Sequence, residues 1–218
     1  MNFANLSATV KSLSIPLIAF TIIACQSETN AQTVDPSKYQ NVPQQITPST
    51  GDKVEVMELF WFGCGHCFAL EPGIKNWKSS KPANAEFVKV PAIFTSNLWE
   101  FHGKAFYTMK ALGLPDEAYD NFFNHLHIKR RGISDLDQLA EFISQYGKSA
   151  DEVSSAFNSF DVDNKVRMAK KITRQSGTRG VPAIVVDGKY LTNQRLAGST
   201  DQMFQVVNQL VNKSAAER

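Results

Sequence analysis

Cys64 and Cys67 are the residues of this 218-residue chain whose type and spacing most directly predict a chemistry. They lie in the stretch MELFWFGCGHCFALEP, residues 57–72, with Gly65 and His66 between them. A Cys-X-X-Cys pair can exchange electrons with other thiols, contribute two ligands to a metal site, or close a structural disulfide. The elements around the pair decide between these uses.

The cysteine pair follows a predicted buried strand and opens a predicted helix. The run KVEVMELFWF, residues 53–62, is nearly continuous in apolar character, which is typical of a strand covered on both faces. A glycine ends this run, and CFALEPGIKNWKSS, residues 67–80, can be helical with a kink or break at Pro72. Because unpaired N–H groups and the helix dipole at a helix N-terminus stabilise negative charge, we expect a stabilised thiolate at Cys64.

A stabilised thiolate favours redox chemistry. The thiolate, not the thiol, attacks a disulfide, and its stabilisation favours the reduced protein, so that the protein's disulfide is a good oxidant. His66 adds to this stabilisation when it is charged. Cys67 lies one turn inside the helix, is expected to be more buried, and suits the resolving role. A chain of this length can bury a core without a structural disulfide.

A zinc site is the main alternative use of the cysteines. Structural zinc sites have four ligands, and the sequence offers one cysteine pair. His125 and His127 are separated by one residue rather than the usual three to five, and we expect them to be solvated at a helix end. We therefore predict no metal and no bound organic cofactor, with a non-catalytic metal- or thiol-binding protein as the alternative.

The composition excludes one class of function, and the N-terminus predicts export. The chain is 43% hydrophobic with a formal net charge of +2, so nothing indicates binding to nucleic acid.

An apolar stretch of 13 residues, LSIPLIAFTIIAC at residues 13–25, follows Lys11 near the N-terminus. It is shorter than the roughly 20 residues that cross a membrane. This pattern indicates a secretory signal within residues 1–31 and a periplasmic protein.

The sequence offers two sites at which the signal segment could be cleaved. TNA, residues 29–31, has the small residues that signal peptidase requires. IIAC, residues 22–25, resembles a lipobox, which would make Cys25 the lipid-modified first residue of a membrane-tethered lipoprotein. We favour the lipoprotein, and in either case the exported protein keeps one cysteine pair, Cys64 and Cys67.

The remaining segments predict a mixed sheet that is interrupted by helices. Residues 32–50 are polar and contain several prolines, and we interpret them as a linker. Residues 51–96 hold two strands and a helix, and residues 97–160 have helical spacing and capping sequences, so they are predicted to be a helical insertion. Residues 161–214 complete the sheet domain with a long helix, a hairpin turned at Asp187-Gly188 and a closing helix.

Glu58 is an acidic residue in the middle of the predicted buried strand. It shares strand parity with Val54, Val56 and Phe60, so we expect it to be buried, with a raised pKa unless it is paired. Glu55 has the opposite parity and carries no such expectation. The alternative is that Glu58 points outward at a sheet edge.

From about residue 40 onward the motifs together resemble one family. A Cys-X-X-Cys after a buried strand, with Val181-Pro182 opening a later hairpin, is similar to the thioredoxin fold. The helical insertion and the stretches ELFWFGCGHC, FVKV and TRGVPAIVVDGKY resemble the DsbA family of exported disulfide oxidases. The resemblance implies an α/β fold, namely a thioredoxin-like mixed sheet flanked by helices with an inserted all-helical subdomain.

The resemblance also implies roles for further residues. It places an acid at Glu58, beneath the cysteines, where it helps to move protons, and a partner for that acid at Lys89 on the neighbouring strand. It implies that Pro182 is cis and lies beside the cysteines. The backbone of Val181 would then offer hydrogen bonds to an extended substrate.

One residue departs from the family pattern. The best-studied family members have Pro-His between the cysteines, whereas this chain has Gly65-His66, the dipeptide of protein disulfide isomerase. The redox poise therefore stays open. We expect an exported thiol-disulfide oxidoreductase that introduces disulfides into reduced secreted proteins and is reoxidised by a quinone-linked membrane partner like DsbB. The alternative enzyme is an isomerase or reductase with the same site.

Overall fold

The computed structural model describes Met1 and residues 33–218, and its centre is a five-stranded mixed sheet in the order β1-β5-β4-β2-β3. The central strand β2 (Val54–Phe60) is parallel to β3 (Ala85–Pro91) and antiparallel to β4 (Ala183–Val186). β5 (Tyr190–Thr192) is antiparallel to β4 and to the edge strand β1 (Gln40–Asn41). This topology confirms the predicted fold class.

Every residue of β2 is buried, because both faces of the sheet are covered. On one face, Val54 and Val56 belong to an apolar cluster with α1 (Gly65–Ser80) and α8 (Thr200–Ala216). On the other face, Met57 belongs to a cluster that includes α6 (Phe160–Ser176) and the helical subdomain. The cover on both faces of the sheet explains why the sequence of β2 is nearly continuous in apolar residues, the pattern from which a buried strand was predicted.

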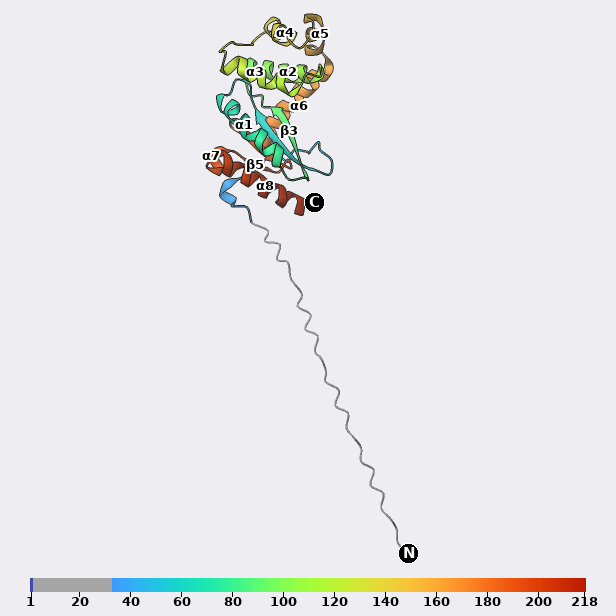
Figure 1. Cartoon of the computed structure of the whole chain (residues 1–218), viewed down its shortest axis with the longest axis vertical. Coiled ribbons are helices and arrows are strands. Elements are labelled where there is room, and N and C mark those ends of the chain that lie inside the picture. Colours follow the sequence, from blue (N-terminus) through green and yellow to red (C-terminus); the bar gives the residue numbers. More distant parts are fainter. Residues whose placement is uncertain (2–32) are drawn as a thin grey trace. The chain divides into compact units, whose positions relative to one another are not determined.

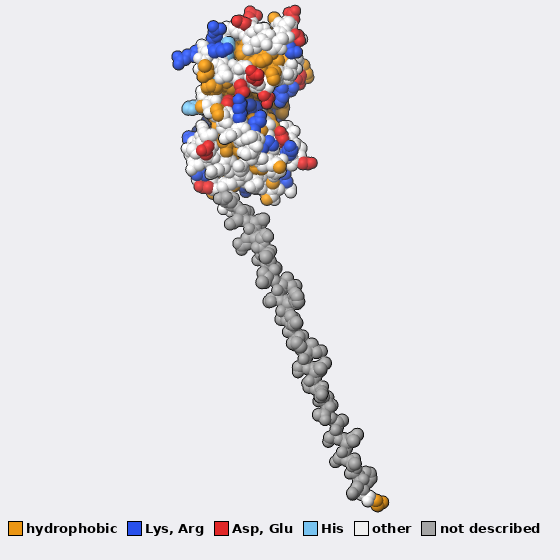
Figure 2. Space-filling view, in the orientation of Figure 1, with side chains coloured by type: hydrophobic (Ala, Val, Ile, Leu, Met, Phe, Trp, Pro, Cys, Tyr) orange, Lys and Arg blue, Asp and Glu red, His pale blue; other side chains and the backbone are white. Residues whose placement is uncertain are grey.

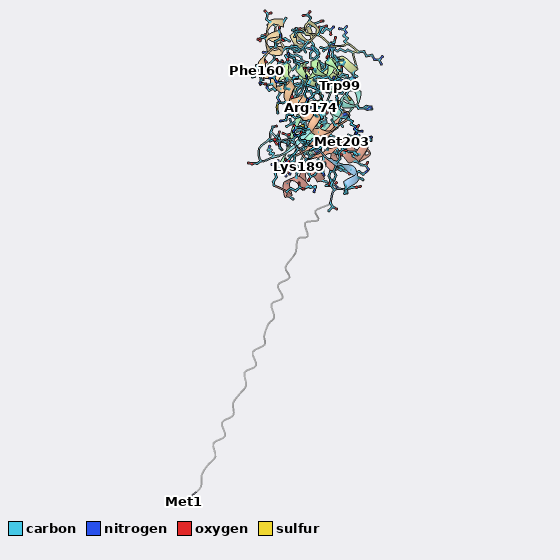
Figure 3. All side chains as sticks on the ribbon, turned by 180° about the vertical axis from the view of Figure 1, so that it is seen from behind. Met1, Trp99, Phe160, Arg174, Lys189 and Met203 are labelled. Carbon is cyan, nitrogen blue, oxygen red and sulfur yellow. The ribbon has the colours of Figure 1, made fainter. Side chains whose placement is uncertain are left out.

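Four helices lie between β3 and α6 and form the inserted subdomain at the top of Figure 1. They are α2 (Asn97–Ala111), α3 (Asp116–His127), α4 (Leu136–Ser144) and α5 (Ala150–Phe157). Aromatic side chains fill the interior of this subdomain, and Ser149 closes the predicted capping box at the start of α5. Figure 3 shows the same division from behind, with Trp99 in the helical half and Met203 in the half that holds α8.

The β4–β5 hairpin turns where the sequence predicts. Asp187 and Gly188 have φ of 53° and 64°, which are the left-handed values of a two-residue type I′ turn. A side chain at Gly188 would also collide with the carbonyl oxygen of Ile46. The turn therefore requires glycine for both its conformation and its surroundings.

The described part of residues 32–50 differs from the predicted linker. Gln40 and Asn41 form β1 against β5, and the N–H of Val42 donates to the carbonyl of Lys189 at 2.8 Å. Val34 and Ile46 are buried. An edge strand joins a sheet through backbone hydrogen bonds, which do not require apolar side chains. The polar and proline-containing sequence of this segment therefore gave no sign of the pairing. The short helices η1 (Pro36–Lys38) and α7 (Gln194–Ala197) lie beside this edge.

Two smaller expectations also differ. The sequence predicts a kink or break at Pro72, whereas α1 continues as one helix through it, because Leu70 and Ile74 on either side are packed into the core. Glu55 is buried although its parity gave no such expectation, and its carboxylate accepts hydrogen bonds from the N–H and hydroxyl of Ser49 at 2.7 and 2.6 Å.

The predicted signal segment, with Cys25 and its lipobox, lies outside the described residues except for Met1. Among the helices that the structure describes, none is long and apolar enough to cross a membrane.

Candidate active site

Cys64 is the N-cap residue of α1. Its Sγ accepts a hydrogen bond from the N–H of Cys67 at 3.2 Å, and its own N–H donates to the carbonyl of Trp61 at 2.9 Å. Both cysteines are free thiols, so the structure represents the reduced form. The sulfur of Cys64 therefore lies where unpaired helix N–H groups and the helix dipole favour an anion.

The surroundings of Cys64 stabilise its thiolate. A hydrogen bond with the Cys67 side chain, N–H groups of Cys67 and His66, and the charge of His66 outweigh partial burial and lower the pKa of Cys64 to about 6. At neutral pH the sulfur is mostly a thiolate, the form that attacks a disulfide and leaves one easily. His66 itself is exposed on the first turn of α1.

Cys67 has the opposite environment. It is 0% exposed, and burial, followed by the hydrogen bond and charge of Cys64, raises the pKa of its thiol. One sulfur is thus anionic and accessible, and the other is protonated and buried. This difference is the physical basis on which the two cysteines can divide the attacking and resolving roles.

A buried ionic cluster lies next to the cysteines. Glu58 on β2 is in register with Lys89 on β3, and Lys89 Nζ is 3.4 Å from Glu58 Oε2. Lys89 donates its hydrogen bond to Glu71 of α1 instead, which leaves both carboxylate oxygens of Glu58 without a hydrogen-bond partner among the residues described. The structure therefore brings Glu58 and Lys89 together and adds Glu71, which the sequence analysis missed.

The cluster sets the protonation of Glu58. Burial raises the pKa of Glu58 to about 7, the charge of Lys89 opposes this, and the charges of Glu71 and Cys64 add to it. Burial would lower the pKa of Lys89, but the charges of Glu58 and Glu71 outweigh it and raise that pKa, so Lys89 stays charged. The charge of Glu58 in turn contributes to the raised pKa of Cys67. Glu58 can therefore hold or release a proton near neutral pH, within electrostatic reach of the buried thiol.

The loop before β4 lies against Cys64. Cys64 Sγ lies 3.5 Å from the carbonyl oxygen of Val181, to which its protonated form can donate, and the Val181–Pro182 peptide bond is cis, in agreement with the expectation from the resemblance. This loop forms one wall of an open groove of about 910 Å³, which His66 also lines. The groove reaches the β1–β5 edge and α7, so the edge strand that was interpreted as a linker contributes to the surroundings of the site.

Trp61 and His127 are two further neighbours of the site that sequence analysis missed. Trp61 stacks on Trp99 of α2, with ring centroids 4.2 Å apart, and covers Gly63, where any side chain would collide with its ring. His127 was expected to be solvated, but its Nε2–H donates to the carbonyl of Phe62 at 2.7 Å. No local pattern reports these contacts, because they join the active-site loop to helices from the insertion.

Glu71 did leave a signal in the sequence. It lies four residues after Cys67, and Cys67, Leu70 and Ile74 mark the buried side of α1. Helical periodicity places Glu71 on that side, so an acid facing the core could have been predicted.

Within residues 33–218, no group of three or more His, Cys, Asp or Glu side chains is arranged to hold a metal ion.

Comparison with known proteins agrees with this geometry. A family model described as a DSBA-like thioredoxin domain matches residues 74–210. The thiol:disulfide interchange protein DsbA of Pseudomonas aeruginosa is 31% identical over 82% of this chain and 84% of its own length. That of Azotobacter vinelandii is 32% identical over 85% of this chain and 89% of its own length.

Solved structures show the same relationship. The crystal structure of Pseudomonas aeruginosa DsbA superposes with a TM-score of 0.76 and 31% identity, and covers 83% of this chain and 95% of that one. DsbA from Xylella fastidiosa, at 24% identity, shows the shared fold with a TM-score of 0.76 over 82% and 96% of the two chains. The chain therefore belongs to the DsbA family of thioredoxin-fold thiol:disulfide interchange proteins and is a thiol-disulfide oxidoreductase.

Proposed function

We propose that the Cys64–Cys67 disulfide oxidises cysteine pairs in exported polypeptides, with Cys64 forming the mixed disulfide and Cys67 leaving as it forms. Cys67 resolves the mixed disulfide when Cys64 has instead attacked a disulfide of the substrate. The observation that carries this proposal is the contrast between the two sulfurs: Cys64 is a stabilised thiolate at a helix N-terminus, and Cys67 is a buried thiol. A disulfide whose reduction releases a stabilised thiolate is a good oxidant.

The exchange proceeds in two steps. A substrate thiolate attacks Cys64 Sγ, a new S–S bond forms, and the Cys64–Cys67 bond breaks with Cys67 leaving as a thiolate that takes up a proton. A second substrate thiolate then attacks the substrate sulfur of the mixed disulfide and releases Cys64 as its stabilised thiolate. The substrate loses two electrons and the protein gains them. A reoxidising partner must remove these electrons, and the family resemblance suggests a quinone-linked membrane protein like DsbB.

Glu58 supplies the proton for Cys67 in this proposal, and Lys89 tunes its release. A carboxyl with a pKa of about 7 is protonated in about half of the molecules at neutral pH, so it can donate and later recover a proton. The negative charge of Glu71 raises the pKa of Glu58 further, and Glu71 accepts the hydrogen bond of the Lys89 that lies between the two acids.

Val181 and Pro182 hold the substrate next to Cys64. The carbonyl of Val181 is within 3.5 Å of Cys64 Sγ, so a backbone hydrogen-bonded there would bring its cysteine to the attacking sulfur. Pro182 has no N–H and adds no competing donor. Both residues line the open groove, which has room for an extended segment.

Export and membrane attachment are part of the proposal. The apolar stretch of residues 13–25 is of the length of a signal segment, and disulfide formation belongs in an oxidising compartment such as the periplasm. The IIAC pattern before residue 26 supports lipid attachment at Cys25.

Gly65 supports a second candidate, the isomerase or reductase. The reduction potentials characteristic of DsbA and of protein disulfide isomerase differ by about 60 mV, and the Gly65-His66 dipeptide is that of the isomerase. The test compares two rates: oxidation of a reduced two-cysteine peptide by the stoichiometric oxidised protein, and unscrambling of a protein with incorrect disulfides. We expect oxidation to be the faster process and the Cys64→Ser variant to perform neither. Faster unscrambling would favour the isomerase.

A further inference from the structure

The groove beside Cys64 carries positive charge and no negative charge. Arg179 from the loop before Pro182 and Arg195 from α7 line it together with His66, and no Asp or Glu of the described chain lines it. Both arginines are exposed, and neither forms an ion pair within residues 33–218, where Arg218 is the one arginine that does so.

A second group of cations flanks the site from the helical subdomain. His127 at the end of α3 donates to the carbonyl of Phe62, two residues before Cys64, and its ring stacks on Phe68 with centroids 5.0 Å apart. These contacts fix the end of α3 beside the start of α1. The chain continues through Ile128 into Lys129, Arg130 and Arg131, so this exposed basic loop, residues 129–131, begins two residues after the contact between α3 and the active-site loop.

The basic loop is exposed and unpaired. None of its three side chains forms an ion pair with a described carboxylate, although Glu141 lines the same small cavity as Lys129 and Arg131. Figure 2 shows Lys and Arg side chains gathered at the upper left, where α3 ends, on the same edge of the molecule as a histidine.

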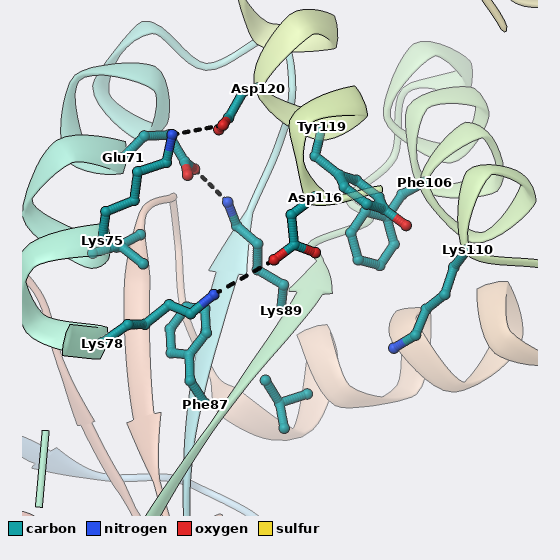
Figure 4. Close-up of a pocket in the computed structure, with 12 residues that line it drawn as sticks. Glu71, Lys75, Lys78, Phe87, Lys89, Phe106, Lys110, Asp116, Tyr119 and Asp120 are labelled. Atoms are coloured by element: carbon teal, nitrogen blue, oxygen red, sulfur yellow. Dashed lines mark hydrogen bonds and ion pairs between the residues drawn. The ribbon is translucent and has the colours of Figure 1, made fainter. Parts of the chain in front are cut away.

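In another pocket of the molecule, three of the four lysines are paired with described carboxylates and Lys110 is not. In the pocket between α1, β3, α2 and α3, Lys75 pairs with Asp120 at 2.6 Å, Lys78 with Asp116 at 4.0 Å, and Lys89 with Glu71 (Figure 4). The chain as a whole has a formal net charge of only +2. Unpaired cations such as Lys110 and Lys171 also lie elsewhere in the described chain, so what distinguishes the active-site groove is that Arg179 and Arg195 line it without any Asp or Glu.

We infer that this electropositive face, formed by Arg179, Arg195 and the basic loop, binds acidic segments of reduced client polypeptides that flank the reacting cysteine. The inference rests on the proposed function and names its substrate class. A cleft lined by one sign of charge concentrates and steers partners of the opposite sign. The same field favours the substrate thiolate, because that nucleophile is an anion as well.

The test uses two reduced peptides with identical cysteine pairs, flanked in one by Asp and Glu and in the other by Lys and Arg. The second-order rate of oxidation by the oxidised protein is measured as salt rises from about 0.01 M to about 1 M, which shortens the screening length from about 30 Å to about 3 Å. We expect the acidic peptide to react about tenfold faster at low salt, and the two rates to converge at high salt. Equal rates at low salt would overturn the inference.

Charge variants connect this preference to the groove. Arg179→Gln/Arg195→Gln should slow the acidic peptide about three- to tenfold and leave the basic peptide unchanged or faster. Lys75→Gln/Lys110→Gln removes the same charge from the pocket of Figure 4 and is expected to keep the wild-type preference. An equal loss for both peptides in the arginine variant would overturn the inference, because it would assign the arginines to the exchange step.

Two further readouts distinguish a choice of substrate from a failure of the exchange reaction and from lipid binding. If neither peptide is oxidised at any salt concentration, the proposed function fails, whereas oxidation of both without preference overturns only the choice of substrate. Vesicles with anionic headgroups are tested by co-sedimentation. Vesicle binding that is lost in Arg179→Gln/Arg195→Gln while the peptide rates stay at their wild-type values would assign this face to lipid and overturn the inference.

Discussion

Glu58→Gln should make the protein more stable above neutral pH, and the structure gives the size of the effect. Glu58 is 0% exposed, and its pKa is raised from 4.5 to about 7, mainly by burial. The folded state therefore holds this proton more tightly than the unfolded state. Ionisation costs no folding free energy below about pH 4.5, and the full cost is reached above about pH 7. At about 1.4 kcal/mol per pKa unit, the cost is about 3 kcal/mol.

Glutamine has nearly the same volume and does not ionise, so the variant avoids this cost. Lys89 keeps its hydrogen bond to Glu71 and is not left without a partner. Urea unfolding of the two reduced proteins between about pH 5 and about pH 8 measures the difference. The unfolding free energies should nearly coincide at the acidic end and differ by up to about 3 kcal/mol, in favour of the variant, at the alkaline end. A difference that does not depend on pH, or a less stable variant at pH 8, would refute the reasoning.

The same substitution should impair the reaction. Without an ionisable group beside Cys67, its proton must come from water through a closed core, so oxidation of a reduced peptide near neutral pH should slow by about tenfold or more. A variant that is more stable and yet slower would explain why an acid occupies this buried position. Unchanged oxidation rates would contradict the proton-transfer role of Glu58 and leave it a structural role only.

Three other predictions concern the thiolate, the dipeptide and the N-terminus. Alkylation of Cys64 in the reduced protein should rise with pH around a midpoint near 6, and a midpoint near 9 would show that the helix N-terminus does not stabilise the thiolate. Gly65→Pro should make the protein more oxidising in equilibration with glutathione buffers, because position 65 has open space and lies at the first helical residue; an unmoved potential would exclude the dipeptide as its determinant. A lipid on Cys25 should carry the mature protein into detergent and raise its mass above that of the peptide, whereas an unmodified chain starting at Gln32 would contradict it.

The parts of the fold and the site that the sequence predicted are those with local signals. The apolar run of β2, the Cys64–Cys67 spacing at a helix start and the Asp187-Gly188 turn each depend on a few neighbouring residues, and the structure has each of them. Glu58 required only the alternation of a strand, which correctly predicted its burial. Local patterns are informative here because the same residues both form the element and orient the side chain.

The missed features depend on contacts between distant segments. β1 joins the sheet through backbone hydrogen bonds, so its side chains carry no apolar alternation. Glu55 is an exception, because the apolar run had already predicted cover on both faces of the strand, and the parity argument applied to Glu55 took account of one face only. His127 reaches the carbonyl of Phe62 only because α3 packs over α1, an arrangement that no sequence window contains.

The division of roles, in which Cys64 attacks and Cys67 resolves, is tested most directly by trapping mixed disulfides. Cys64→Ser and Cys67→Ser are incubated separately with a substrate protein that presents both thiols and disulfides, then quenched with acid and separated on non-reducing gels. Cys67→Ser should accumulate mixed disulfides through Cys64, because the thiolate at the helix N-terminus is intact and the resolving thiol is gone. Cys64→Ser should trap almost nothing, because the remaining sulfur is buried and protonated. Equal trapping by the two variants, or stronger trapping through Cys67, would contradict this division.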